Sequence, residues 1–395
     1  MRSRKGIAVA LPALLLFAAA LEAPAGAAAQ KWPAPPAAAE STPPPDAGGG
    51  DQPGDPSADP SAPPADPSAD PSAPPADPSA DPSAAPPDEG DGDAGEQPPP
   101  SQIAEGPNAD DFVPIRQAPR VRNVRTARGG SRGTFRTRCG TNENEHHNPD
   151  NVVAAPGVQN GAHHIHDYVG NLTTDAFSTD ESLAAGGTTC DNGDLSTYYW
   201  PVIRNRAGQD DSDRAQQSTA DGNVGEIVLP TRADISFRGN PRSKVVAMPR
   251  FLRMAVGDAK SATNGLANAR AFWTCSGFTN RGFTDKYPLC PGDSQVMRVL
   301  DFASCWDGQN TDSANHRDHV AFPQRNGACP QGTQAIPQLR YTLSYDLPNQ
   351  AQAFALDSFP EQGHDPVTDH ADVINVMPEE LMQRAVRCIN KGRRC

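Results

Sequence analysis

The stretch Arg340-Tyr341-Thr342-Leu343-Ser344-Tyr345, within Gln338–Leu347, has the clearest pattern in the chain and decides its fold class. Large apolar side chains alternate with polar ones, as they do in a strand with one buried face. Shorter segments of similar character, separated by turn residues, are Thr134–Cys139, His164–Val169, Thr197–Arg204, Glu226–Leu229, Ala233–Phe237, Lys244–Met248, Ala271–Cys275 and Val296–Phe302. We therefore predict a β-rich domain with long loops, either a sandwich or an α+β fold.

One helix is predicted, at the C-terminus. Pro378 suits its first turn, Glu379 and Glu380 suit the positive end of the helix dipole, and Gly392 ends it. One apolar face follows the helical period and consists of Leu381, Met382, Ala385, Val386 and Ile389. The adjacent Cys388 can tie this helix to the body.

All eight cysteines lie between Cys139 and Cys395. An even number in an exported chain favours four disulfides, although eight cysteines allow about 105 pairings. No C-x-x-C spacing occurs, so the sequence does not support a cysteine zinc site or a thioredoxin-like redox motif.

The first 29 residues have the organisation of a secretion signal. Arg2, Arg4 and Lys5 precede an apolar run from Ile7 to Leu21, and small residues offer cleavage sites up to Ala29. The run is shorter than the roughly 20 residues that span a bilayer. We predict cleavage of residues 1–29, which leaves no integral membrane span; a retained anchor is the alternative.

Charge divides the rest of the chain. The net charge is −14, yet residues 30–111 hold seventeen acids and one lysine, while the 30 acids and 30 bases after Asp111 cancel. Residues 30–111 repeat an eleven-residue Asp/Pro/Ser/Ala unit with no apolar face, so we predict a disordered, acidic, proline-rich spacer. Residues 112–133 are predicted to be an Arg/Gly-rich linker that is solvated or contacts the acidic spacer, with a basic arm for anionic polymers as the alternative. The globular domain is then 134–395, and this distribution argues against a nucleic-acid-binding protein.

The nine histidines form four short groups, and these are the candidates for chemistry. On a strand, His164 and His166 share a face; on a helical turn, His316 and His319 do. With nearby carboxylates, such groups can bind a divalent metal that keeps an open position for water, or can act as acid/base pairs. The structural alternative is that they are surface or satisfied core residues. We predict catalytic roles for His164, His166, Asp307, His316, His319, His370 and Asp372, and metal ligands among His164, His166 and His319.

Large aromatic residues are candidates for stacking on sugar rings in a secreted β-rich protein. We predict Trp200, Trp306 and Asn171 as substrate contacts. Packing in the core is the alternative for each tryptophan.

The body resembles the secreted domain-of-unknown-function family nineteen-ninety-six, found in high-GC Gram-positive bacteria and, with WSC modules, in fungi. Matching blocks over 133–391 include Gly133–Arg136, Pro156-Gly157, His164-Ile165-His166-Asp167, Gly170-Asn171, Tyr199-Trp200-Pro201, Phe251–Met254, Gly257-Asp258, Ser304-Cys305-Trp306-Asp307-Gly308, Asp312-Ser313 with His316 and His319, Pro337–Leu339 and His370–Asn375. The resemblance implies an extracellular location and places the functional site at the histidine blocks, but it implies no reaction. Val373 and Ile374 replace an aromatic residue that is usual there.

Our leading hypothesis is a secreted hydrolase-like enzyme, associated with the cell wall or released, that acts on cell-wall or environmental polysaccharide. Either a divalent metal held by histidines activates water, or Asp307 and Asp372 form a carboxylate pair. A non-catalytic surface module that binds glycan or metal on a proline-rich stalk is the main alternative. A disulfide-linked structural coat protein is the third.

Overall fold

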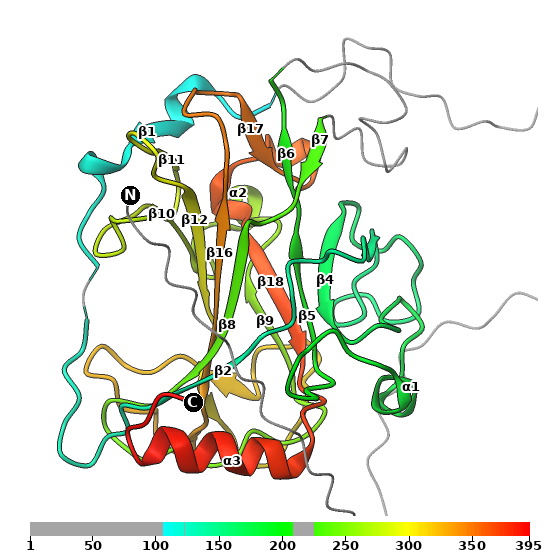
Figure 1. Ribbon diagram of the computed structural model, residues 1–395, viewed down its shortest axis with the longest axis vertical. Coiled ribbons are helices and arrows are strands. Elements are labelled where there is room, and N and C mark those ends of the chain that lie inside the picture. Colours follow the sequence, from blue (N-terminus) through cyan, green and yellow to red (C-terminus); the bar gives the residue numbers. More distant parts are fainter. Residues whose placement is uncertain (1–105, 122, 208–224) are drawn as a thin grey trace, which may run out of the picture. The chain divides into compact units, whose positions relative to one another are not determined.

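The computed structural model describes residues 106–121, 123–207 and 225–395. The predicted signal peptide and almost all of the predicted spacer lie outside these residues. Figure 1 shows the described part as strands enclosed by long loops, with the C-terminal helix at one end. Among the described residues, none of the helices combines the length and apolar character needed to cross a bilayer.

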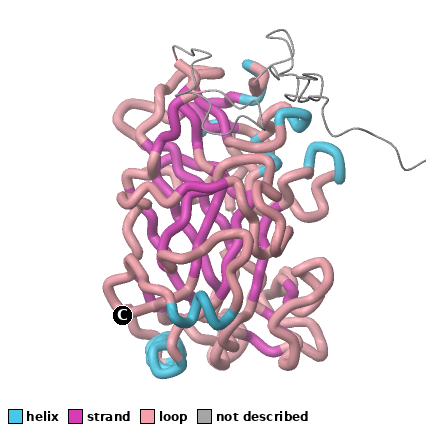
Figure 2. The backbone as a smooth tube through the Cα atoms, turned by 90° about the vertical axis from the view of Figure 1, so that its right-hand side faces the viewer, coloured by secondary structure: helices cyan, strands magenta, loops and turns pink. Residues whose placement is uncertain are grey.

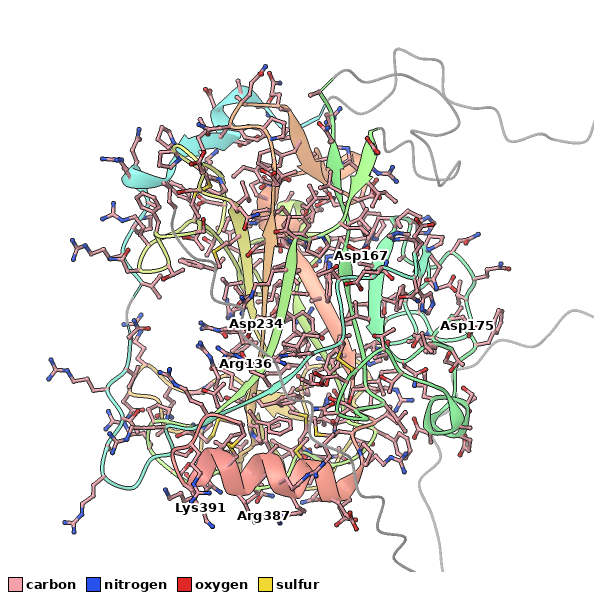
Figure 3. The ribbon with its side chains drawn as sticks, viewed as in Figure 1. Arg136, Asp167, Asp175, Asp234, Arg387 and Lys391 are labelled. Carbon is pink, nitrogen blue, oxygen red and sulfur yellow. A yellow bond between two sulfur atoms is a disulfide. The ribbon has the colours of Figure 1, made fainter. Side chains whose placement is uncertain are left out.

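The predicted strand at Gln338 is the centre of a five-stranded antiparallel sheet. This strand, β16 (Gln338–Tyr345), lies between β12 (Val296–Asp301) and β8 (Arg232–Arg238). The outer strands are β10 (Ala271–Cys275) and β2 (Thr134–Thr137). On the outer face, Arg136 of β2 and Asp234 of β8 form an ion pair of 3.2 Å (Figure 3).

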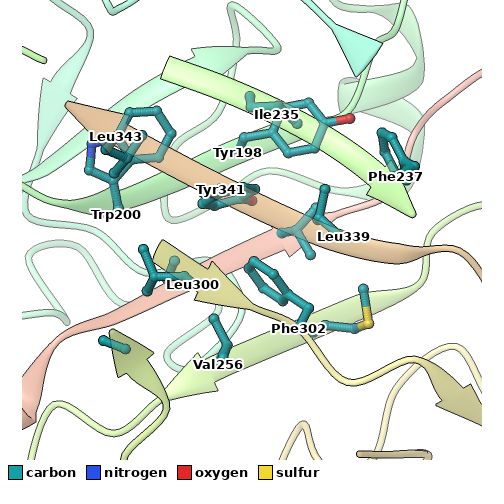
Figure 4. Close-up of a cluster of buried hydrophobic side chains, with 14 of the residues drawn as sticks. Tyr198, Trp200, Ile235, Phe237, Val256, Leu300, Phe302, Leu339, Tyr341 and Leu343 are labelled. Atoms are coloured by element: carbon teal, nitrogen blue, oxygen red, sulfur yellow. The ribbon is translucent and has the colours of Figure 1, made fainter. Parts of the chain in front are cut away.

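A second five-stranded antiparallel sheet packs against the first. Its order is β3 (His147–Asn148), β4 (His166–Gly170), β5 (Thr197–Pro201), β18 (His370–Ile374) and β9 (Arg253–Gly257). Tyr341 of β16 makes edge contacts with the rings of Tyr198 and Trp200 of β5, so the inner faces of the two sheets share one core (Figure 4). The predicted β-rich class is confirmed, and the arrangement is a sandwich.

Smaller elements surround the sandwich. Three small sheets pair β1 (Phe112–Pro114) with β11 (Tyr287–Leu289), β13 (Cys305–Trp306) with β14 (Val320–Ala321) and β15 (Gln334–Ala335), and β6 (Ile203–Asn205) with β7 (Glu226–Val228) and β17 (Phe354–Leu356). The α-helices are α1 (Asp180–Ala185), α2 (Ser261–Asn264) and α3 (Glu379–Asn390); single 3-10 turns occur at Ala109–Asp111, Ile115–Gln117, Pro360–Gln362 and Pro366–Thr368. Figure 2 shows the strands at the centre and the helices towards the periphery.

The predicted C-terminal helix is confirmed as α3, and the eight cysteines form four disulfides: Cys139–Cys190, Cys275–Cys290, Cys305–Cys329 and Cys388–Cys395. The last of these joins the end of α3 to the C-terminal residue. Disulfides are typical of proteins from oxidising compartments.

Two expectations about the backbone need correction. Lys244–Met248 forms no strand, because the amide of Val245 bonds to the side chain of Asn390 instead of to a neighbouring strand. The segment 112–133 is not simply a linker, because Phe112 and Ile115 are buried in the main core and β1 pairs with β11. The globular unit therefore begins before Thr134.

Candidate metal centre

Three buried histidines converge on the outer face of the second sheet. The Nε2 atom of His164 lies 3.1 Å from Nε2 of His166 and 3.0 Å from Nε2 of His370. The third side of the triangle, between Nε2 of His166 and Nε2 of His370, is 3.5 Å. Within the described residues, these three form the one group of His, Cys, Asp or Glu side chains that could share a metal ion.

Strand alternation brings the triad together. On β18, Ala371 and Val373 face the main core, so His370 and Asp372 face the opposite side of the sheet. The pairing of Asp372 with Tyr199, continued by two residues, places His370 level with Pro201 of β5. His166 pairs with Pro201 from the other side. The two imidazoles thus reach towards each other across β5, and His164 approaches from just before β4.

A glycine on the neighbouring strand permits this approach. Gly257 pairs with His370 and has a φ of +82°, a conformation that glycine adopts without strain. A Cβ atom at this position would lie 2.1 Å from the carbonyl oxygen of Asp369 and 2.6 Å from Cα of His370. Gly257 therefore cannot be replaced without moving the backbone that carries His370.

Backbone carbonyls determine which ring nitrogens carry protons. The Nδ1 atoms of His166 and His370 each lie 3.0 Å from a carbonyl oxygen, of Asp150 and of Thr368 respectively. Because a carbonyl can only accept, each Nδ1 carries the proton and each neutral ring presents an Nε2 lone pair. Two lone pairs therefore face each other across 3.5 Å, which is unfavourable unless a cation or a proton lies between them.

The donor set fits a divalent metal bound by three imidazoles. Metal–nitrogen bonds of about 2.0–2.1 Å in tetrahedral geometry separate the nitrogens by roughly 3.3–3.4 Å, close to the three distances observed. A metal-binding histidine commonly donates its other ring N–H to a backbone carbonyl, as Nδ1 of His166 and of His370 do. His164 is the exception, because its buried Nδ1 has no hydrogen-bond partner of standard geometry. Imidazole ligands suit zinc, copper, nickel and iron.

Burial keeps His164 and His166 neutral at physiological pH. The pKa of His164 is held well below its usual value, first by burial and then by the neighbouring His166 and His370. The pKa of His166 is lowered in the same way, with a smaller contribution from Arg298. Neutral imidazole is the form that binds metal, so these two rings are prepared for binding without losing a proton.

A cavity of about 240 Å³ opens onto the triad, and His164 and His370 form part of its wall. Asp372 also lines it and is almost fully buried. Asn151 Nδ2 donates to Oδ2 of Asp372 at 3.1 Å, and the hydroxyl of Tyr199 donates to Oδ1 of Asn151 at 2.7 Å. Burial raises the pKa of Asp372, opposed by His370 and by the bond from Asn151.

Two buried ion pairs fix the backbone on either side of the triad. Arg298 of β12 binds Asp369, the residue before His370, and also donates to the carbonyl of Pro201 at 2.8 Å. Arg204 binds Asp357 at 2.9 Å, and this carboxylate accepts the amide of Ile165, between His164 and His166. The two pairs connect the ligand-bearing segments to the core.

The structure separates the remaining predicted catalytic residues from the triad. Both ring nitrogens of His319 are engaged, Nδ1 with Oγ of Ser313 at 2.9 Å and Nε2 with the carbonyl of Arg253 at 2.7 Å. His319 is therefore replaced by His370 in the candidate metal set. His316 pairs with Asp312, and Asp307 accepts bonds from Gln309 and Asn310 within its own turn. The predicted pair of Asp307 and Asp372 is not supported, because only Asp372 lines the cavity.

The predicted substrate contacts also lie elsewhere. Trp200 is completely buried in the main core and donates from Nε1 to Asp167, so its ring is not accessible to a sugar. The amide of Asn171 is buried and bonded to the carbonyls of Leu183 and Leu195. Trp306 packs beside the core and donates to the carbonyl of Asn310. Neither tryptophan nor Asn171 is among the residues that line the cavity.

Among the cavity residues that were not anticipated, four have polar, charged or aromatic side chains: Asn151, Lys260, Arg317 and Phe359. Asn151 follows the Asn148-Pro149-Asp150 turn, and Arg317 lies between the two histidines of the H-x-x-H motif. Their closeness in sequence to predicted site residues could have identified both as candidates. Lys260 follows the Gly257-Asp258 block by two residues, and Phe359 lies in a stretch without a motif.

Comparison with known proteins identifies a family. The model of the family described as "Domain of unknown function (DUF1996)" matches residues 150–375, a range that includes the triad and the cavity residues. Neither a curated protein nor a solved structure gives a significant match.

Proposed function

Since this chain belongs to the domain-of-unknown-function family DUF1996, whose description states no reaction, we propose a function from the site itself: a metal-dependent hydrolase. His164, His166 and His370 hold one divalent ion, with zinc as the preferred metal, and Asp372 serves as general base. The observation that carries the proposal is the convergence of three buried Nε2 atoms beside an accessible cavity that His164 and His370 line.

An open site favours catalysis over a purely structural metal. Structural zinc sites are closed by four protein ligands, whereas catalytic sites use three and keep a position for water or substrate. Among the described residues no fourth His, Cys, Asp or Glu joins the triad, and the cavity provides access to it. The same argument disfavours the alternative of a non-catalytic metal-binding module.

The protein's own residues have separable tasks. A divalent ion in such a site supplies Lewis acidity and lowers the pKa of bound water. Asp372 is placed to accept a proton in the cavity, since its carboxylate lines the wall and is oriented by Asn151. Tyr199 in turn fixes Asn151, and the carbonyls of Asp150 and Thr368 fix two imidazoles. Burial of these groups excludes bulk water and strengthens their electrostatic interactions.

We further propose that the protein is exported and that its substrate is a cell-wall or environmental polysaccharide. Four disulfides and the signal-like first 29 residues support export. The cavity volume of about 240 Å³ is close to the roughly 300 Å³ at which small-molecule pockets begin, so it suits one small polar unit better than several. Non-catalytic glycan binding is the outcome if saturable binding occurs without products.

Metal content of the purified full chain is the decisive measurement. Inductively coupled plasma mass spectrometry should find close to one equivalent of zinc or another divalent metal. His166→Ala and His370→Ala should each lose it, while His146→Gln, a half-buried histidine outside the triad, should retain it. Metal-free, folded wild-type protein that takes up no added divalent ion would refute the proposal.

Asp372→Asn separates catalysis from binding. An asparagine preserves an oxygen that accepts the bond from Asn151, so metal content should be unchanged. Hydrolysis of a polysaccharide identified by screening should fall by about 10²–10⁴-fold, the usual contribution of a general base. Full activity in this variant would exclude Asp372 as the base.

A further inference from the structure

The loop 312–319 carries His316 and His319, which do not reach the metal centre. Hydrogen bonds within the loop hold it in a fixed conformation. Oγ of Ser313 accepts the backbone amides of Arg317 and Asp318, at 3.2 and 3.1 Å. Nδ1 of His319 binds the same hydroxyl, and its Nε2 anchors the loop to the carbonyl of Arg253. The two ends of the loop are thus held to each other and to strand β9.

The turn of this loop directs Arg317 into the cavity. His316, the preceding residue, has a φ of +55°, a conformation that costs a non-glycine residue energy and persists where surrounding contacts impose it. The bond between its Nδ1 and Asp312, 2.8 Å long, is one such contact. Arg317 lines the cavity, and its guanidinium donates to the carbonyl of Gly257, the residue paired with His370.

Lys260 is a second cation at the same cavity. Its Nζ lies 4.8 Å from the ring centre of Phe359, another lining residue. Within the described part of the chain, neither Lys260 nor Arg317 has a carboxylate within 4.0 Å. Lys260 is exposed and Arg317 is half-buried, and both keep donors that can make charge-assisted hydrogen bonds to an anion in the cavity.

The cavity lining also contains two acids, Asp258 and Asp372, but neither forms an ion pair with Arg317 or Lys260 within 4.0 Å. Asp258 accepts the amide of Lys260 at 2.9 Å and the side chain of Asn264. Asp372 accepts from Asn151. One guanidinium nitrogen of Arg317 is anchored to Gly257, and the remaining donors are able to hold an oxyanion.

We infer that Arg317 and Lys260 form an anion-recognition subsite beside the metal centre, and that the substrate is an acidic saccharide unit. This inference rests on the proposed function for the reaction but not for the binding. The negative charge of the saccharide is either the carboxylate of a uronic acid or a phosphate, because the guanidinium of an arginine recognises both. The H-x-x-H loop then serves to position an arginine.

The test is calorimetric titration of the full chain with glucuronate, glucose 6-phosphate and glucose, each with metal-loaded and chelator-treated protein. Glucuronate or glucose 6-phosphate should bind at least tenfold more tightly than glucose, and rising salt should weaken that binding. The tighter anion identifies the charge. Arg317→Gln and Lys260→Gln should each reduce the preference about tenfold, whereas Arg384→Gln on α3, away from this cavity, should not.

Equal binding of glucose and both anions, or an unchanged preference in both cavity variants, would overturn the inference. Lys260→Gln keeps the test valid if Arg317→Gln fails to fold. Metal content measured on the same samples distinguishes the two proposals. Anion selectivity in a protein without metal supports the subsite and rejects the metal-dependent hydrolase. Bound metal without anion selectivity supports the hydrolase and rejects the subsite.

Discussion

Nε2 of His166 and Nε2 of His370 lie 3.5 Å apart, although each ring donates its only proton from Nδ1 to a backbone carbonyl. The two residues are 204 positions apart in sequence and lie on strands separated by β5. Their juxtaposition is therefore a product of the sheet, and it brings together two lone pairs that repel each other without a cation. The free energy of folding should consequently depend on metal.

Chelation should destabilise the wild-type protein. A metal present at about 100 times its Kd stabilises the folded state by about 2.7 kcal/mol, which raises the Tm of a domain of this size by roughly 5–8 °C. Thermal unfolding with added zinc and with EDTA measures the difference. His166→Ala should show no metal-dependent shift, and a shift equal to that of the wild type in this variant would place the bound metal elsewhere.

Removal of Arg298 alone should destabilise the protein more than removal of both partners of the Arg298–Asp369 ion pair. Both side chains are completely buried, so Arg298→Met leaves an uncompensated carboxylate next to His370. Loss of one partner of such a pair costs about 3–5 kcal/mol, whereas removal of both often costs little. Urea unfolding should therefore find Arg298→Met less stable than the double variant Arg298→Met/Asp369→Leu. The opposite order would mean that the packing of Arg298 matters more than its charge.

Much of the fold was predictable because its strands alternate. The inward residues Leu339, Tyr341 and Leu343 give β16 a clear period of two, and most other predicted strands overlap observed ones. Strand β18 was missed because every residue in His370–Ile374 is buried. One face of β18 lies in the main core and the other supports the site. Because both faces are buried, the strand lacks the alternation of buried and exposed residues that marks the others.

The site was predictable in part. The H-x-H spacing correctly placed His164 and His166 together, because the local period of a strand is visible in the sequence. The choice of His370 over His319 as the third ligand could not be made from the local sequence. It depends on the register between β5 and β18, which places His370 level with Pro201, and on a carbonyl of β9 that engages His319.

The disulfides should contribute unequally to stability. Cys139–Cys190 spans 51 positions and Cys388–Cys395 spans 7. Loop-closure entropy predicts about 4 kcal/mol for the first and about 2.5 kcal/mol for the second. Paired Cys→Ser variants, compared by urea unfolding, should follow this order. Equal losses would show that local packing, rather than restriction of the unfolded chain, determines the contribution of each bond.

A last prediction concerns His364, which lies outside the cavity lining and makes stability depend on pH. Burial lowers its pKa from 6.5 to about 4, with a further contribution from nearby Arg206. The folded state therefore binds this proton less readily than the unfolded state. The stabilisation is fully present above pH 6.5 and is lost as the pH falls towards 4, by about 3 kcal/mol in total.

His364→Asn is the matched variant. Asparagine tolerates the φ of +52° at this position, and its amide can replace Nδ1 as the donor to the carbonyl of Leu356. Urea unfolding of chelator-treated protein at pH 7.5 and pH 4 should show a loss about 3 kcal/mol smaller in the variant than in the wild type. The remaining loss in the variant includes His164 and His166, whose pKa values are also lowered by burial. An identical loss in both proteins would mean that His364 becomes protonated without opening the fold, and that the triad accounts for the acid sensitivity.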